Sequence, residues 1–185
     1  MRLFVSSAFE PAFVANLKTV ADYARDNAGR DAVKWVDPGA FHITYAFLGE
    51  LGGQAAAAAA KSIDEALAAT PAFRISSGGF GCFPSQRRPS VLWLGISDGS
   101  AELREIARRL SESMAANGVF FEERFEPHVT LGRVKRALPE NFFRRTADFS
   151  AAKKASSLIS SVDLMESRLT SEGPVYSLVH SRRLL

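Results

Sequence analysis

The 185-residue sequence is poor in residues on which several common protein chemistries depend. It contains a single cysteine, Cys82, which excludes an intramolecular disulfide and a cysteine-based zinc site. A lone thiol with no activating partner nearby in the sequence is typical of a small buried hydrophobic residue. A chain without disulfides suits a reducing compartment, and we therefore expect a cytoplasmic protein.

Long hydrophobic runs and a strong excess of one charge are also missing. The apolar stretch in the opening segment MRLFVSSAFEP is too short for a signal peptide. No apolar run approaches the roughly 20 residues that are needed to cross a bilayer. Lys and Arg total 23 against 20 Asp and Glu, a net charge of +3 that is small for a non-specific nucleic-acid binder. The sequence predicts no membrane association, and local groups must bind any anionic ligand.

Two of the three histidines lie in a repeated tripeptide, HIT at 42–44 and HVT at 128–130. Each copy lies in an apolar run typical of a β-strand, FHITYAFLGE and PHVTLGRV. Because side chains alternate along a strand, the His and Thr of each copy point to the same face. If the two strands face each other across a groove, two imidazoles and two hydroxyls meet there. The alternative is that both copies are ordinary strand residues with hydrogen-bonded side chains.

Hydrophobic periodicity predicts one α+β domain. A composition of 46% hydrophobic and 23% charged residues is typical of a globular protein with a sizeable core. The order strand, helix, His-x-Thr strand, helix occurs twice, and no linker rich in Pro, Gly or Ser separates the halves. We expect residues 1–185 to form a single bilobal domain with an internal duplication. Its two pseudo-symmetric lobes should contain mainly antiparallel sheets flanked by helices, with the active-site groove between them.

The expected elements follow from the same periodicity and from Pro and Gly at their ends. Besides the two motif strands, we expect strands at 2–9, 73–83, 90–97, 156–166 and 175–182. The expected helices are 11–28, 54–69, 99–116 and a short one at 139–146.

Two imidazoles beside one phosphate can divide acid–base work. A neutral ring accepts a proton from the attacking oxygen and a protonated ring donates one to the leaving oxygen, with no cofactor or metal. Thr44 and Thr130 would donate hydrogen bonds to the non-bridging oxygens. Two histidines on separate strands without a nearby cluster of Asp or Glu make a poor metal site, which disfavours a metal-dependent phosphodiesterase.

A cation should accompany the hydroxyls, and Arg133, five residues after His128, is the nearest candidate. Strict alternation places it on the face opposite to His128, but Gly132 permits a bulge that would re-aim it. Arg133 is therefore either a phosphate ligand or an ordinary surface cation. Arg87 and Arg88 either attract RNA to the groove or are simply solvated.

Three aromatic residues, Trp35, Phe41 and Phe83, are candidates for stacking on a base, although each also suits the core. The third histidine, His180, has no Thr two residues later, and we expect it to be structural or exposed.

The paired motifs resemble those of the 2H phosphoesterase superfamily. The surrounding sequence resembles the bacterial and archaeal RNA 2′,3′-cyclic phosphodiesterase branch, formerly described as 2′-5′ RNA ligases. Matching segments run almost end to end: RLFV at 2–5, KWV at 34–36, FLGE at 47–50, FP at 83–84, VLW at 91–93, PHVTL at 127–131, Arg133, ES at 166–167, Leu169 and GPVY at 173–176. Tyr45 stands where the family usually has Leu, which implies a change in the groove wall.

The resemblance implies a bilobal α+β fold and opening of a terminal RNA 2′,3′-cyclic phosphate to a 2′-phosphomonoester without metal. It implies that His128 is the proton acceptor that activates water and that His42 is the proton donor to the departing 3′ oxygen. The symmetry of the motifs does not decide between these two roles. The implied partner is RNA with such a terminus, with no obligate protein partner. Ligation of RNA by a 2′-5′ bond and non-catalytic binding of RNA or nucleotides are the alternatives.

Overall fold

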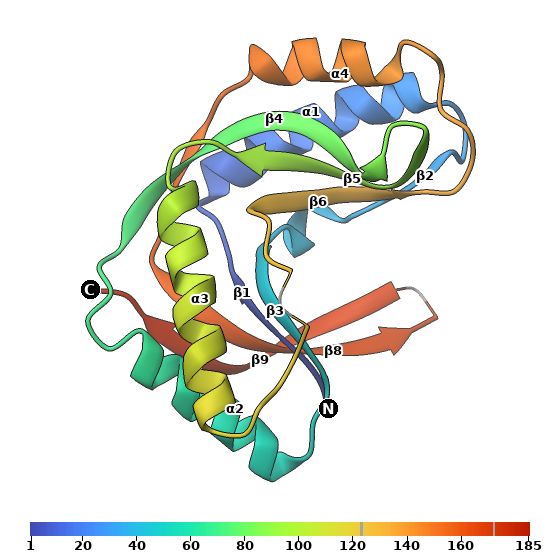
Figure 1. Cartoon of the computed structure of the whole chain (residues 1–185). Helices are drawn as coiled ribbons and strands as arrows, with labels where there is room; N and C mark the ends of the chain where they lie inside the picture. The colour runs from blue at the N-terminus through green and yellow to red at the C-terminus, as the bar shows by residue number, and fades with distance from the viewer. Residues whose placement is uncertain (123, 172) are drawn as a thin grey trace.

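The computed structural model describes residues 1–122, 124–171 and 173–185. It has the predicted α+β architecture, with strands in two sheets and helices packed outside them (Figure 1). The strands are β1 (Arg2–Ser7), β2 (Val33–Trp35), β3 (Ile43–Glu50), β4 (Phe73–Ser85), β5 (Arg88–Ile96), β6 (His128–Val134), β7 (Ser156–Ile159), β8 (Ser161–Thr170) and β9 (Gly173–Arg183). The helices are α1 (Pro11–Ala28), α2 (Gly53–Ala66), α3 (Ser100–Ala116), α4 (Phe142–Ala151) and the short 3₁₀ turn η1 (Pro38–Ala40).

The strands form a four-stranded sheet in the order β3-β1-β8-β9 and a five-stranded sheet in the order β2-β6-β5-β4-β7. Neighbouring strands pair antiparallel in both sheets. The first motif strand, β3, belongs to one sheet and the second, β6, to the other, which confirms the bilobal arrangement. Each sheet draws strands from both halves of the chain, so neither lobe is a contiguous half. The internal duplication itself stays a prediction.

Each long helix buries the apolar stripe that predicted it. In α3 the residues Leu103, Ile106, Leu110 and Met114 are all buried, at the three- and four-residue spacing of one helix face. Figure 1 shows α3 beside α2 at one end of the molecule and α1 beside α4 over the five-stranded sheet. Because helices cover the outer faces, the inner faces of the two sheets are left to form the groove. None of the helices in the described residues is long and apolar enough to cross a bilayer.

Several predicted boundaries are wrong. The expected strand 156–166 is two strands, β7 and β8, which lie in different sheets. The short helix expected at 139–146 is α4, which begins at Phe142 and continues to Ala151. The first strand ends at Ser7, and α2 ends at Ala66. The strand β2 was not predicted, because a three-residue strand carries too little periodicity to be recognised.

Candidate active site

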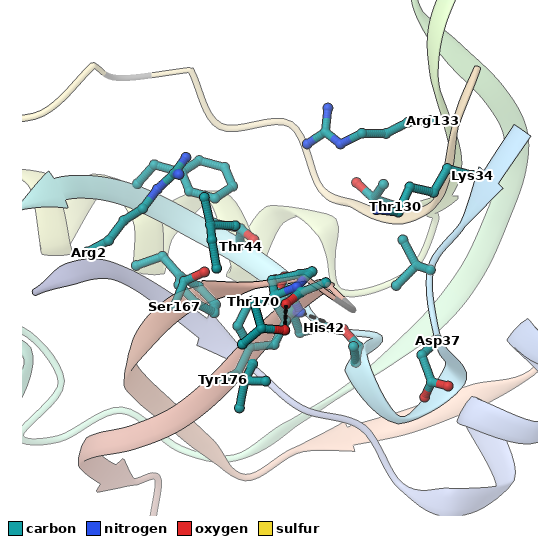
Figure 2. Close-up of a pocket in the computed structure, with 18 of the residues that line it drawn as sticks. Arg2, Lys34, Asp37, His42, Thr44, Thr130, Arg133, Ser167, Thr170 and Tyr176 are labelled. Atoms are coloured by element: carbon teal, nitrogen blue, oxygen red, sulfur yellow. Dashed lines mark hydrogen bonds between the residues drawn. The ribbon is translucent and has the colours of Figure 1, made fainter. Parts of the chain in front are cut away.

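A cavity of about 700 Å³ lies between the two sheets and receives both motifs. Its walls include His42 just before β3 with Thr44 within that strand, and His128 and Thr130 at the start of β6. Figure 2 shows Thr130 on one side of this groove and His42 with Thr44 on the other. The structure thus brings together the four motif side chains that the sequence placed on two separate strands.

Both imidazoles are fixed by the same hydrogen bond. The Nδ1 atom of His42 lies 2.7 Å from the carbonyl oxygen of Ala40, and that of His128 lies 2.6 Å from the carbonyl oxygen of Glu126. A carbonyl oxygen only accepts hydrogen bonds, so each Nδ1 carries the proton and donates it. The Nε2 atom of each neutral ring is therefore left with a free lone pair for proton transfer.

Different structures hold the two accepting carbonyls in place. Ala40 ends the turn η1, in which the Asp37 side chain accepts a hydrogen bond from the Gly39 N–H at 2.8 Å. Glu126 instead forms an ion pair with Arg104 of α3, at 2.9 Å between Nη2 and Oε2. A turn closed by the Asp37 side chain therefore orients His42, whereas an ion pair with a helix supports the segment that orients His128.

Aromatic rings flank each histidine. The His42 ring lies 5.1 Å from Phe4 and 5.6 Å edge-on to Tyr176, measured between ring centroids. The His128 ring lies 5.1 Å edge-on to Phe83, and Trp93 is 6.3 Å away. These rings exclude water from the sides of the imidazoles and restrict their rotation.

Burial lowers the pKa of both histidines below the usual 6.5, because it disfavours the charged ring. For His42, the hydrogen bond to Ala40 opposes this effect and the charge of His128 adds to it. For His128, the backbone hydrogen bond to Glu126 and the negative charge of that residue both oppose it. The two imidazoles are thus held mainly neutral at pH 7, and within the described residues only His128 has a carboxylate that favours its protonated form.

A β-bulge follows each motif and decides which later side chains face the groove. In β3, Thr44 pairs with Ser6 and Ala46 with Val5, so that Tyr45 is the extra residue. The residue five positions after the histidine, Phe47, therefore lines the groove.

The bulge in β6 has the same position in its motif. Thr130 pairs with Trp93 and Gly132 with Leu92, so that Leu131 is the extra residue. The shift turns Arg133 into the groove (Figure 2). Of the two interpretations of Arg133 that the sequence left open, this position fits a phosphate ligand.

Sequence reasoning missed several residues that line the groove. They include Arg2, Lys34, Phe47, Ser167 and Tyr176. Lys34 lies beside Arg133 because β2 pairs with β6, a neighbour relation that requires the sheet order. All five residues lie in segments that carry the family resemblance, which was the one available signal.

The other aromatic candidates have different positions. Trp35 lines the groove, Phe41 is buried in the core, and Phe83 contacts His128. The expected effect of Tyr45 on the groove wall is wrong. Its side chain is buried, stacks on Phe125, and shares a 3.0 Å hydrogen bond with the Ser7 hydroxyl.

Two further expectations concern residues outside the groove. His180 is structural, with Nε2 3.0 Å from Asp64 on α2. Cys82 is only partly buried, and burial raises the pKa of its thiol. Within the described part of the chain, no three His, Cys, Asp or Glu side chains are grouped as metal ligands would be.

Known proteins resemble this chain along almost its whole length. Residues 12–170 match the 2′-5′ RNA ligase superfamily. The RNA 2′,3′-cyclic phosphodiesterase of Aeropyrum pernix is 36% identical over 163 residues, which cover 84% of this chain and 90% of that protein. The protein of the same name from Archaeoglobus fulgidus is 32% identical over 178 residues, which cover 95% and 96% of the two chains.

Solved structures share the fold. The crystal structure of TT0787 of Thermus thermophilus has a TM-score of 0.79 at 21% identity and covers 100% of this chain and 98% of its own. Escherichia coli LigT complexed with 3′-AMP has a TM-score of 0.75 at 22% identity, with 99% and 97% covered. The matched relatives, the fold and the two His-x-Thr motifs agree, and the chain belongs to the 2′-5′ RNA ligase superfamily of 2H phosphoesterases.

Proposed function

We propose that this protein hydrolyses 2′,3′-cyclic phosphate ends of RNA to 2′-phosphomonoesters, using His42 and His128 as the acid–base pair. The observation that carries the proposal is the geometry of the two imidazoles, which line one groove with Nδ1 bound to backbone carbonyls and Nε2 available. The names of the relatives in Aeropyrum pernix and Archaeoglobus fulgidus support the choice of substrate.

The proposed reaction is a displacement at phosphorus. The Nε2 atom of His128 accepts a proton from water as the water oxygen bonds to phosphorus, and the bond from phosphorus to O3′ breaks. The protonated Nε2 of His42 then donates its proton to the departing O3′, leaving the phosphate on O2′. One proton enters His128 and one leaves His42, so exchange with solvent restores the pair.

Thr44 and Thr130 are assigned to the non-bridging oxygens. Their hydroxyls project into the groove from the same strand faces as the histidines. Arg133 adds a full positive charge from the same wall as Thr130, which a neutral hydroxyl cannot supply. Together these donors would hold the phosphorus between the rings and stabilise the negative charge of the transition state.

The surroundings of the histidines support the assigned roles. The carboxylate of Glu126 stabilises the imidazolium that forms when His128 accepts a proton. Among the residues that the structure describes, no carboxylate has this effect on His42, and the charge of His128 lowers the pKa of His42 further, which favours release of its proton. His128 is thus the better proton acceptor and His42 the better proton donor.

The test is incubation with an RNA oligonucleotide that ends in a 2′,3′-cyclic phosphate, in buffer with EDTA. We expect a product with a 2′-phosphate, and none from the His42→Ala/His128→Ala double variant. A 3′-phosphate product, or hydrolysis that needs an added divalent ion, would contradict the proposal. Tight RNA binding without turnover would indicate a binding module, and joining to an added second RNA would indicate a ligase.

A further inference from the structure

Six basic side chains gather at one end of the five-stranded sheet, beyond the histidines. Lys34 of β2 pairs in register with Arg133 of β6, and Arg133 pairs on its other side with Val91 of β5. The β4–β5 turn, which contains Arg87 and precedes Arg88, reaches the end of the sheet where β6 finishes (Figure 1). We call this group the cationic rim: Lys34, Arg87, Arg88, Arg133, Lys135 and Arg136.

The cationic rim has no neutralising ion pairs in the part of the chain that the structure describes. All six side chains are exposed, and among the described residues none of them is paired with a carboxylate. Lys18 and Arg108, on helices, are by contrast each paired with a carboxylate. The whole chain carries +3, so the residues outside these six sum to −3 (3 minus 6). A local excess of this kind attracts a polyanion to one place rather than to the whole surface.

The cationic rim is continuous with the groove. Lys34 and Arg133 line the groove itself, and Figure 2 shows them side by side above it. Lys135 and Arg136 follow directly, and their backbone N–H groups donate to the Ala32 carbonyl at 2.7 and 3.2 Å. Strand β6 rises about 3.3 Å per residue, which places its end about 20 Å from His128. A single nucleotide held at the histidines does not reach that far.

We propose that the cationic rim binds the RNA backbone on the 5′ side of the terminal nucleotide, so that the enzyme prefers RNA ends to cyclic mononucleotides. This inference rests on the proposed function. A cyclic phosphate at the 3′ end leaves the chain only its 5′ side to extend, and that side must leave the groove. Arg and Lys contacts to phosphates carry no base information, so recognition along the rim is independent of sequence.

The test compares two substrates in three proteins. The substrates are 2′,3′-cyclic AMP and a ten-nucleotide RNA that ends in the same cyclic nucleotide. The proteins are the wild type, the variant Arg87→Gln/Arg88→Gln/Lys135→Gln/Arg136→Gln, and the control Lys153→Gln/Lys154→Gln. The two control lysines are exposed and precede β7, which pairs with the opposite end of β4 from the turn.

For the rim variant we expect kcat/KM for the RNA to fall at least about tenfold at low salt. Its kcat/KM for cyclic AMP should stay within about twofold of the wild type, and the control should change neither value. Each lost phosphate contact should also make the slope of log(kcat/KM) against log[salt] shallower by about 0.7. Unchanged RNA turnover in the rim variant, or an equal loss with both substrates, would overturn the inference.

Fluorescence anisotropy with a labelled ten-nucleotide RNA separates this inference from the proposed function. If the wild type hydrolyses neither substrate, the proposed function fails. Weaker RNA binding by the rim variant alone would then still support the rim. RNA binding equal to that of the wild type would overturn the rim even if both substrates are hydrolysed.

Discussion

His42 and His128 are held alike, yet they face different neighbours. Each ring donates Nδ1–H to the carbonyl two residues earlier, and each lies between two aromatic residues. Five residues after each histidine, however, a bulge presents Phe47 on one side of the groove and Arg133 on the other. Glu126 adds a carboxylate near His128 that has no counterpart near His42 among the described residues. The shared features suit proton transfer, and the differences give a nearly symmetric site a direction.

The shared features should account for the largest effects. His42→Ala and His128→Ala should each lower kcat by about 10² to 10⁴, the usual contribution of positioned acid–base catalysis. His180→Ala is the matched control, because His180 bonds Asp64 outside the groove. Steady-state kinetics on a cyclic-phosphate RNA measure all three. If one motif histidine could be removed with no more loss than His180, the two would not act as a pair.

The next effect tests the difference between Arg133 and Phe47. Arg133→Gln should lower kcat/KM by about 10- to 100-fold, mainly through kcat, because a hydrogen bond from a charged group to the transition state is worth about 1.5–3 kcal/mol. Phe47→Ala should raise KM by up to about tenfold with a smaller change in kcat, because an exposed ring offers stacking area but no charge. Identical kinetic signatures for the two variants would show that the two positions have no separate roles.

The hydroxyls should have smaller effects. Thr44→Val and Thr130→Val should each lower kcat by about tenfold, as expected for the loss of one neutral hydrogen bond. Thr→Ser at the same positions keeps the hydroxyl and should restore most of the activity. A Ser variant as impaired as the Val variant would point to the methyl group and packing instead.

The smallest effect concerns the carboxylate beside His128. Glu126→Gln keeps the backbone carbonyl but removes a negative charge that favours the protonated ring, so the pKa of His128 should fall. Arg104→Gln frees that carboxylate from its ion pair, so the pKa should rise. NMR titration of the imidazoles can measure both shifts. Shifts in the same direction in both variants would rule out this electrostatic explanation.

Side-chain alternation made the central part of the site predictable. An extended backbone alone places His42 and Thr44 on one strand face, and likewise His128 and Thr130. The resemblance of the surrounding sequence indicated the family. Alternation failed for Arg133, because a single glycine did not reveal whether a bulge was present. Lys34 reaches the groove through the pairing of β2 with β6, and Tyr176 through the pairing of its neighbour β8 with β1; local patterns do not encode such pairings between distant segments. The cytoplasmic location stays a prediction.

The most direct test of the paired-histidine account is the pH dependence of kcat/KM for the wild type, His42→Ala and His128→Ala. Because burial lowers both pKa values, the wild type should give a bell with its maximum below the usual histidine pKa of 6.5. Protonation of the base causes the acidic limb, so His128→Ala should lose that limb. Deprotonation of the acid causes the alkaline limb, so His42→Ala should lose the other. Loss of the same limb in both variants, or a wild-type profile without two limbs, would contradict the account.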